Sequence, residues 1–325
     1  MARIVSLGSA LQDVYLIDRD DLRPTTIGEE AIFGNVLVGS KVDIDRLSYE
    51  VGGGGINSAI TFSRCGHEAI CMTNIARDSA GNAILRMLDR EGIDSSYVEY
   101  VDRKATGTSV ILLDAKGGER TILTYRGASE KFSNFSEEDL ELIQPDWLYV
   151  TTLRGDMDTL LRFFEKAKSL GAKIMFNPGK GELKESKKLL GLLSDVDVLL
   201  VNKSEAAQMV PGVLLTELLY RLNNYVETVI ITDGAMGGIA GRKVTAEDGE
   251  AYRFGIYEDK SVKDATGAGD AFGSGFLAAL SAGKSFRQSL IFASANSTAV
   301  VSEIGANRGI LTGREKLHLM PIQKI

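Results

Sequence analysis

Residues 264–276 read DATGAGDAFGSGF and form the most specific pattern in the chain. The second half of this stretch begins a helix with one apolar face, so Gly267 and Gly269 lie where the helix starts. Glycines there let the backbone approach a ligand closely and leave N–H groups free at a helix N-terminus, which suits a phosphate. Asp270 stands in the first turn, where a carboxylate accepts a hydroxyl proton or simply complements the helix dipole. The dipole alone does not explain two glycines and a second acid, Asp264, so the segment favours phosphate chemistry.

Upstream of this motif, helix-length amphipathic segments alternate with short, nearly all-apolar runs: Trp147–Thr151, Lys173–Phe176, Val196–Val201 and Thr228–Thr232. Apolar strands separated by helices predict a mostly parallel sheet covered on both faces, which is an α/β fold. Two excursions, near residues 10–51 and 104–127, read instead as antiparallel strands, the second as a hairpin turning at Gly117-Gly118. We expect them to pair into one small sheet, a lid over the ligand-binding end of the main sheet. No repeat or linker divides the chain, so we expect a single domain, 1–325.

The composition is that of an ordinary globular protein and excludes several classes. The chain has 325 residues, of which 44% are hydrophobic and 25% charged, and this rules out disorder and collagen. Its 37 basic and 44 acidic side chains give a net charge of −7 and a pI near 5.2. Such a chain lacks the basic face that a nucleic acid or a membrane surface requires, so neither partner is expected.

Histidine and cysteine are scarce, which narrows the chemistry further. With only His67 and His318 the chain builds no multi-histidine metal site, and a Ser/His/Asp centre is disfavoured. Cys65 and Cys71 are too few for a disulfide framework and lack the CxxC spacing of zinc sites. We expect both to be buried, reduced thiols. The N-terminal segment lacks the apolar core of a signal peptide and no apolar run is long enough to span a bilayer, so the sequence indicates a cytoplasmic protein.

Two glycine patterns imitate nucleotide-binding motifs without meeting them. The sequence GKS at 283–285 ends like a P-loop, but Ala278 stands where that loop needs its first glycine, so a helix C-terminus is the better interpretation. The run Gly52–Gly55 precedes a stretch, Asn57–Ser63, that resembles the start of a helix. The run does not satisfy GxGxxG, because Asn57 and Ser58 stand where the third glycine is required. An oxidoreductase with a dinucleotide-binding fold is therefore disfavoured.

The glycine-rich motifs resemble those of a known family. Residues 264–276 are similar to the C-terminal signature of the ribokinase-like (PfkB) carbohydrate kinases, and GGGGINSAITFSRCG, residues 52–66, resembles their N-terminal signature. Further elements follow in the family's order along the whole chain: Thr106-Gly107, Arg126-Gly127-Ala128, Asn177-Pro178, Asn202-Lys203-Ser204-Glu205, Thr232-Asp233-Gly234 and Gly305-Ala306. The resemblance implies a three-layer fold with a mostly parallel central sheet and a small β-sheet lid. It also implies an ATP-dependent sugar kinase that uses Mg²⁺.

The resemblance assigns catalytic and nucleotide-binding positions. Asp270 would be the general base, and the amides of residues 267–270, which include Gly267, Ala268 and Gly269, would form an anion hole for the γ-phosphoryl group. The positions implied for ATP are Asn202, Thr232, Gly234, Gly237, Gly267, Gly269 and Asn296, with Glu205 holding Mg²⁺ through water. A monovalent cation such as K⁺ is implied beside the anion hole at Asp264, Thr266, Val300 and Gly305. From the residues alone, Asn202 and Glu205 also suit a helix cap, and Asn296 suits a buried amide, so these alternatives stay open.

The family's sugar-contacting positions fall on six residues of this chain: Asp13, Gly53, Gly54, Asn57, Arg126 and Asp270. Carboxylates and amides suit a polyol, because each hydroxyl both donates and accepts a hydrogen bond. Leu11 and Gly54 stand where ribokinases have Asn and Lys, which argues against ribose itself. Arg126 either meets a substrate carboxylate, as in the similar 2-keto-3-deoxy sugar-acid kinases, or braces the lid. We expect a neutral sugar as acceptor; the alternatives are a sugar acid, a nucleoside, or a ligand-binding protein without turnover.

The lid also carries an expectation about assembly. Ala31–Phe33 and Val36–Val38 are apolar runs in what should be a thin sheet with two faces. Such a sheet cannot bury both faces against its own domain. We therefore expect a homodimer formed through the lid sheets.

Overall fold

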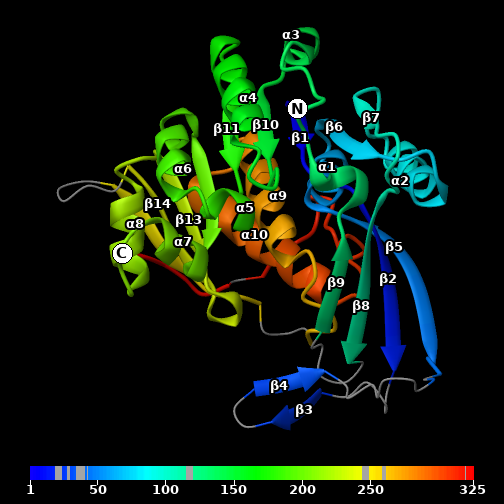
Figure 1. Ribbon diagram of the computed structural model, residues 1–325. Helices are drawn as coiled ribbons and strands as arrows, with labels where there is room; N and C mark the ends of the chain where they lie inside the picture. Colours follow the sequence, from blue (N-terminus) through cyan, green and yellow to red (C-terminus); the bar gives the residue numbers. More distant parts are fainter. Residues whose placement is uncertain are drawn as a thin grey trace.

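The main sheet of the computed structural model is large and mostly parallel, as the sequence predicts (Figure 1). The structure describes residues 1–18, 24–27, 30–33, 41, 43–114, 120–243, 249–257, 261–318 and 320–325. Within these ranges the sheet contains β1 (Arg3–Leu7), β6 (Glu68–Ile75), β7 (Val98–Tyr100), β10 (Trp147–Val150), β11 (Lys173–Phe176), β12 (Val198–Asn202), β13 (Thr228–Thr232), β14 (Gly238–Arg242), β15 (Glu250–Phe254) and β16 (Ile322–Lys324). Their order is β16-β15-β14-β13-β12-β11-β10-β1-β6-β7. The strands from β13 to β7 pair in parallel, and β14, β15 and β16 add an antiparallel edge.

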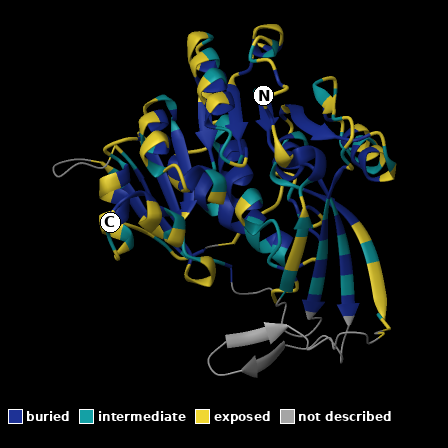
Figure 2. Cartoon of the chain, viewed as in Figure 1, coloured by how far each residue is buried: buried dark blue, intermediate teal, exposed yellow. Residues whose placement is uncertain are grey.

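Helices cover both faces of this sheet, which gives the three layers that were predicted. One layer consists of α1 (Gly54–Arg64), α2 (Ser79–Arg90), α9 (Ala268–Ser281) and α10 (Phe286–Val301). The other consists of α3 (Asp139–Ile143), α4 (Met157–Ser169), α5 (Lys180–Leu183), α6 (Ser186–Leu192), α7 (Lys203–Met209) and α8 (Leu215–Leu222). Successive strand residues enter opposite cores: Ile4 packs with the first helix layer and Val5 with the second. Figure 2 shows the buried strands between helices whose outer sides are exposed. None of the described helices combines the length and the apolar character needed to cross a membrane.

The predicted lid is a second, four-stranded sheet. It consists of β2 (Leu11–Asp18), β5 (Arg46–Gly52), β8 (Gly107–Asp114) and β9 (Arg120–Tyr125), in the order β5-β2-β8-β9. This confirms that the excursions near residues 10–51 and 104–127 join in one small sheet. Burial alternates along β2 and β8, so one face of the lid turns toward the body and the other turns outward (Figure 2). The inward face carries a small apolar cluster with Ile304 of the body: Tyr15, Ile17, Ile111 and Leu113.

Part of the first excursion forms a separate two-stranded ribbon. In it β3 (Pro24–Ile27) and β4 (Glu30–Phe33) pair antiparallel. The predicted turn at Gly117-Gly118 and the run Val36–Val38 lie outside the described residues, as do the side chains of Ala31–Phe33.

Three local expectations from the sequence need correction. Helix α1 begins at Gly54, not at Asn57, because Gly53 with φ 98° turns the chain directly into the helix. Strand β12 begins at Val198 instead of Val196, since residues 193–195 form a short 3₁₀ turn. Cys65 is partly exposed rather than buried; Cys71 is buried, and both thiols are free.

Candidate active site

The turn between Asp264 and Asp270 separates two cavities. Both lie where strands of the main sheet end. Residues that follow β1, β10 and β11 line the smaller cavity, and Thr232, the last residue of β13, lines the larger one. The larger cavity, of about 550 Å³, is lined from the turn by Ala265, Ala268 and Gly269. The smaller, of about 340 Å³, is lined from the turn by Thr266, Gly267 and Asp270. A group that passes from a molecule in one cavity to a molecule in the other must therefore pass this turn.

The N-terminus of α9 offers free backbone donors between the two cavities. Gly267 adopts φ 79°, and a Cβ there would lie 2.7 Å from Ala306, so only glycine fits. Within the described chain the amides of Gly267, Gly269 and Asp270 donate no hydrogen bond, and that of Ala268 makes only a 3.5 Å contact. Unpaired amides at the positive end of a helix form an anion-binding site. The turn therefore presents unpaired amides at the residues where the sequence predicts an anion hole.

Asp270 lies in the first turn of α9 and faces the smaller cavity. Asn57 of α1 donates its Nδ2–H to Oδ2 of Asp270 at 2.9 Å, and no described residue donates to Oδ1. Burial raises the pKa of Asp270 above its ordinary value, and the hydrogen bond from Asn57 lowers it. One oxygen is thus held by an amide while the other stays available to a ligand hydroxyl, which is the arrangement a general base needs.

Asp13 of β2 forms the lid side of the smaller cavity. Its side chain is only 4% exposed, and the hydroxyl of Ser109 on β8 donates a hydrogen bond to it. The carboxylate packs directly against Gly52, where a Cβ would lie 2.1 Å from Oδ2. Burial, with a smaller contribution from neighbouring carboxylates, raises the pKa of Asp13 to about 7, against the lowering effect of the Ser109 bond. Gly53 and Gly54 complete this wall.

Arg126 also lines the smaller cavity. Its guanidinium makes no hydrogen bond or ion pair within the described chain. Burial lowers the pKa of Arg126, as does the positive charge of Arg154, while Asp13 raises it. Arg126 thus borders the smaller cavity with the charge of Arg154 near it, and it does not brace the lid through any side-chain bond to a described residue.

The larger cavity lies between the β13–β14 turn and α10. Three predicted positions, Thr232, Gly234 and Gly237, line it. Gly237 adopts φ 78°, and a Cβ there would lie 2.0 Å from the carbonyl oxygen of Phe254, so the turn closes tightly against β15. The apolar part of the wall suits a flat heteroaromatic ring and comprises Phe254, Ile256, Tyr257, Val262 and Phe272.

Asn296 does not line this cavity. The side chain is fully buried, donates to the carbonyl of Ala271 at 2.8 Å and accepts the amide of Leu311 at 2.9 Å. The structure thus contains the buried, hydrogen-bonded amide that the sequence left open as the alternative. The α10 residues that reach the cavity are Ser294, Ser297, Thr298 and Val301.

Comparison with known proteins identifies the chain. The family model described as pfkB family carbohydrate kinase matches residues 1–312. The chain belongs to the pfkB family of carbohydrate kinases. Ribokinase from Haemophilus influenzae is 28% identical over 296 residues, which cover 88% of this chain and 91% of that protein. Ribokinase from Bacillus subtilis is 26% identical over 322 residues, 98% of this chain and all of its own length (100%). Among solved structures, Arabidopsis thaliana ribokinase complexed with ribose and ATP has the same fold, with a TM-score of 0.77 at 21% identity and 96% of each chain covered.

The kinase also has positioning residues that the sequence analysis missed. Thr151 and Thr152 follow β10 and line the smaller cavity. Behind them Glu182 is fully buried and holds the two loops that form this wall. It accepts hydrogen bonds from the Thr152 hydroxyl at 2.7 Å and from the amides of Leu153, Gly155 and Gly179 at 2.8, 2.9 and 2.8 Å. Because parallel sheets bind ligands at their carboxyl edge, the threonines at the end of a predicted strand carried a usable signal; Glu182 carried none.

The Asn202–Glu205 pair forms the helix cap that was the alternative to a metal role, and it also fits Mg²⁺. Asn202 Oδ1 accepts the Glu205 amide at 2.9 Å, and Glu205 Oε2 accepts the Asn202 amide at 2.9 Å. Glu205 additionally lines the smaller cavity, together with Gly267 and Asp270 of the turn. Burial raises the pKa of Glu205, and hydrogen bonds with the amide and the side chain of Asn202 lower it. A carboxylate that borders this cavity is the ligand type that Mg²⁺ and its water shell prefer.

In the cluster expected to hold a monovalent cation, hydrogen-bond donors already surround the Asp264 carboxylate. Asp264 is 1% exposed and accepts four hydrogen bonds: from Tyr15 Oη at 2.7 Å, Thr266 N at 2.9 Å, Thr266 Oγ1 at 2.6 Å and Gly305 N at 3.2 Å. Nε of Arg120, from lid strand β9, lies 3.8 Å from Oδ1 of the same carboxylate. The Val300 carbonyl accepts the amide of Glu303 at 3.0 Å. These residues lie together, and the Arg120 guanidinium already brings a positive charge near the Asp264 carboxylate, where the family resemblance implies K⁺.

Proposed function

We propose that this pfkB-family kinase transfers the γ-phosphoryl group of MgATP to a hydroxyl of a neutral sugar. One observation carries the proposal: two cavities meet at the 264–270 turn, which presents unpaired amides and the Asp270 carboxylate between them. The larger cavity suits the nucleoside part of ATP, and the smaller suits an acceptor. Arabidopsis thaliana ribokinase, which shares this fold, binds ribose and ATP in its solved structure, so a protein of this fold holds both kinds of ligand.

The transfer follows from the residues at the turn. The Asp270 carboxylate accepts the proton of the acceptor hydroxyl while the hydroxyl oxygen forms a bond to the γ-phosphorus. The bond from that phosphorus to the β–γ bridging oxygen breaks, and ADP leaves. Charge that develops on the transferring phosphoryl oxygens is stabilised by the amides of residues 267–270 and the α9 dipole. Mg²⁺, held near Glu205 through water, would neutralise phosphate charge. The lid sheet excludes water, which otherwise competes as acceptor.

The acceptor cavity supports a polyol of modest size. Asp13 and Asn57 supply a carboxylate and an amide, Ser109 and Thr124 add hydroxyls, and Ile111 gives an apolar face. Each sugar hydroxyl can then both donate and accept. A second candidate acceptor is an acidic sugar, because the unpaired Arg126 near Arg154 is suited to a carboxylate or phosphate group. A nucleoside is the third acceptor class that the kinetic test includes.

Steady-state kinetics over an acceptor panel tests this function. ADP release is measured with MgATP and pentoses, hexoses, 2-keto-3-deoxy sugar acids and nucleosides, with Asp270→Asn as the blank. We expect a neutral sugar to give the highest kcat/KM. An acid acceptor in first place, with Arg126→Gln lowering only its kcat/KM, would instead establish the second candidate. Equal ADP release with and without every acceptor would refute the kinase proposal.

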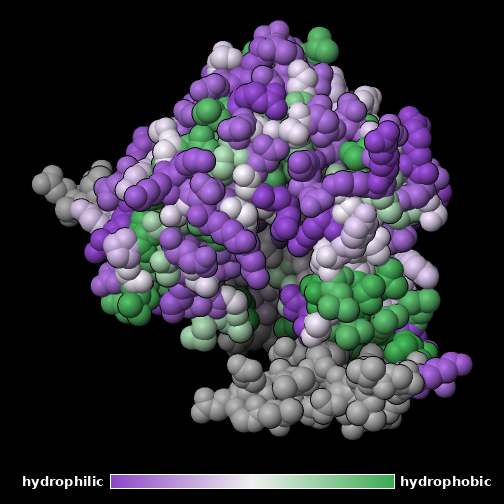
Figure 3. Space-filling view, in the orientation of Figure 1, coloured by the Kyte–Doolittle hydropathy of each residue, from purple (hydrophilic) through white to green (hydrophobic). Residues whose placement is uncertain are grey.

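We also propose that the kinase is a homodimer joined through its lids. The outward face of the lid sheet is apolar across all four strands, with Tyr49, Val14, Val110 and Leu123 in one row of directly paired residues. Tyr49 is 61% and Leu123 59% exposed. Figure 3 shows hydrophobic side chains gathered over this sheet. A patch of this kind on a thin sheet favours burial against a second copy.

For the cluster around Asp264 we propose that the Arg120 guanidinium supplies the positive charge for which the family resemblance implied K⁺. The proximity of Arg120 and Asp264 supports this role. We further propose a cytoplasmic location, supported by the two free thiols and the use of ATP.

A further inference from the structure

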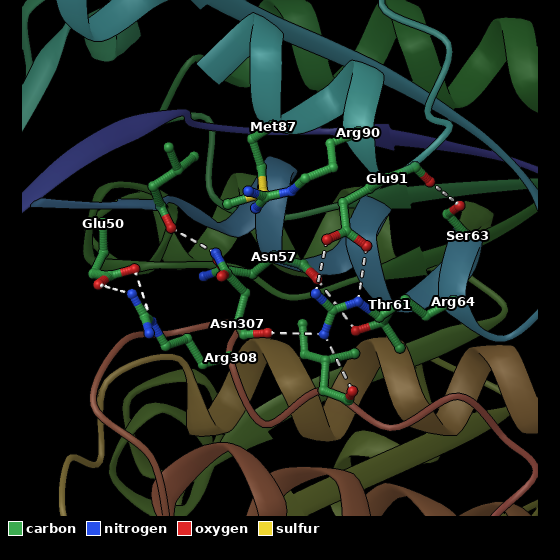
Figure 4. Close-up of polar contacts among 12 residues, drawn as sticks. Glu50, Asn57, Thr61, Ser63, Arg64, Met87, Arg90, Glu91, Asn307 and Arg308 are labelled. Atoms are coloured by element: carbon green, nitrogen blue, oxygen red, sulfur yellow. Dashed lines mark hydrogen bonds and ion pairs between the residues drawn. The ribbon is translucent and has the colours of Figure 1, made fainter. Parts of the chain in front are cut away.

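A third cavity, of about 1010 Å³, lies outside the active site. It is bordered by the lid edge strand β5, by α1 and α2, and by the chain that follows α10. Figure 4 shows the side chains around it, drawn from these four segments. Its volume is that of a small-molecule site, and its position is the junction between lid and body.

Four arginines line this cavity: Arg64, Arg86, Arg90 and Arg308. Two of them are neutralised by carboxylates. Arg64 makes two 2.8 Å bonds to Glu91, and Arg308 bonds Glu50 of β5 at 2.6 and 3.1 Å. The remaining acid of the lining, Glu303, pairs with Lys263 at 3.6 Å. The carboxylates that line this cavity are therefore already in ion pairs.

The other two arginines have no carboxylate partner within the described chain. Arg86 and Arg90 are four residues apart on α2, so their like charges lie on one face of the helix and repel. Arg90 donates only to the sulfur of Met87, at 2.8 Å (Figure 4). Glu91, which bonds Arg64, also interacts through space with Arg90, because the Arg90 charge contributes to the lowered pKa of Glu91. Two adjacent exposed guanidiniums without a hydrogen-bonded carboxylate still form the usual binding group for a phosphate, which each can hold through two parallel hydrogen bonds.

The cavity wall is connected by hydrogen bonds to the catalytic base. Arg64 donates to the carbonyl of Asn307 at 3.2 Å, and Asn307 Nδ2 donates to Asn57 Oδ1 at 3.3 Å. Asn57 in turn holds Asp270. Asn307 also donates to the carbonyl of Val51 in β5, so one side chain joins the lid edge, the acceptor site and the cavity. Figure 4 shows the contact between the Asn307 carbonyl and Arg64.

We propose that this cavity binds a phosphate-bearing small molecule through Arg86 and Arg90, and that the bound anion changes the affinity of the kinase for its sugar. The anion removes the repulsion between the two guanidiniums and bridges α2 to the lid edge through Arg308. A ligand that contacts both lid and body has different contacts in the open and closed states, so it shifts the equilibrium between them. The binding part of the proposal stands on the cavity alone; the coupling part rests on the proposed sugar kinase function.

Calorimetry with the full chain tests the binding part. A non-hydrolysable ATP analogue with Mg²⁺ occupies the active-site anion hole, and inorganic phosphate or a pentose 5-phosphate is then titrated. We expect one site with a dissociation constant below about 1 mM, and at least a tenfold loss of affinity in Arg86→Ala/Arg90→Ala. The matched control removes the same charge from other exposed helix positions, Arg221→Ala/Arg287→Ala, and should bind as the unmodified kinase does. Tighter binding of the ester than of free phosphate identifies a sugar phosphate as the source, and the reverse identifies the free ion.

Unchanged affinity in the α2 variant, or the absence of binding to the unmodified kinase, overturns the proposal. Kinetics test the coupling: the anion should change the sugar KM at least twofold, and the sugar should change the anion Kd by the same factor, since binding linkage is reciprocal. The α2 variant should retain basal kcat and KM and lose the response. Binding without any change in KM would refute the coupling alone, and a loss of basal activity in the α2 variant would overturn the assignment of Arg86 and Arg90 to a separate site.

Discussion

Asp270 and Asn57 meet across two helices, and their hydrogen bond fixes which oxygen of the carboxylate remains free. Replacement by Asn at 270 keeps the shape and removes the proton acceptor. We expect kcat to fall by about 10²–10⁴-fold, or roughly 3–5 kcal/mol of barrier, with sugar Kd changed only a few-fold. Because the pKa of Asp270 is raised, wild-type kcat should also decline as the pH falls through that pKa. A variant that folds, binds both substrates and keeps more than about a tenth of kcat would exclude Asp270 as the base.

We expect the buried Asp13 carboxylate to strengthen sugar binding while it lowers the free energy of unfolding of the apo kinase. Its pKa is about 7 in the native state, against an ordinary value near 3.8, so between these limits the folded chain holds a proton that the unfolded chain has released. Stability of the apo kinase should therefore rise as the pH falls from 8 toward 4. Asp13→Asn removes this titration and should stabilise the chain by about 1–3 kcal/mol at pH 8 and by little near pH 4. Thermal unfolding at both pH values measures this, with the exposed Asp102→Asn as control.

The same residue should show the opposite effect on ligand binding. Asp13→Asn and Asp13→Ala lose a hydroxyl partner in the acceptor cavity, so the sugar KM should rise strongly while the KM for ATP changes little. A variant that is neither more stable at pH 8 nor weaker for sugar would contradict the assignment of Asp13 to this cavity.

Among the structural elements, the lid and the 264–270 turn are linked through Asp264. Tyr15 from β2 and Arg120 from β9 both reach this carboxylate. With the Arg120 charge in place, replacing K⁺ by tetramethylammonium at constant ionic strength should change kcat less than twofold. The substitution Arg120→Met should lower kcat/KM at least tenfold, and the activity of this variant should depend on K⁺. Activation of the unmodified kinase by more than fivefold would instead support the monovalent-cation site implied by the family resemblance.

The elements differ in how well their sequence predicted them. The 264–276 motif and the apolar strands are local patterns, and from them the α9 N-terminus, the parallel sheet and the paired lid excursions were predicted correctly. The start of α1 was wrong because helical glycines carry no local sign of the backbone they pack against; here Gly55 lies on Gly8. Contacts such as Glu182 with two loops, or Arg120 with Asp264, join segments far apart in the chain, and no local pattern encodes them. The arginine cavity was missed for the same reason.

At the scale of the whole molecule, the lid face predicts the oligomeric state. Light scattering should give about twice the 35.1 kDa chain mass at micromolar concentration. Leu123→Glu places a charge on the exposed lid face and should shift the kinase toward monomer by at least tenfold in dissociation constant. Leu142→Glu, on α3 at a position 77% exposed, is the matched control and should remain dimeric. A monomeric unmodified kinase, with and without sugar, would exclude lid-mediated dimers.

Strand β2 has a consequence for how this kinase can acquire new substrates. Asp13 and Tyr15 are two residues apart on one face of the strand, the first on the acceptor cavity and the second bonded to Asp264 at 2.7 Å. A substitution that reshapes β2 for a different acceptor therefore also disturbs the 264–270 turn, and selection acts on both at once. Ile111 and Thr124 line the same cavity and make no hydrogen bond to the turn. Directed evolution toward other acceptors should thus accumulate its first changes at Ile111 and Thr124, while β2 stays constrained.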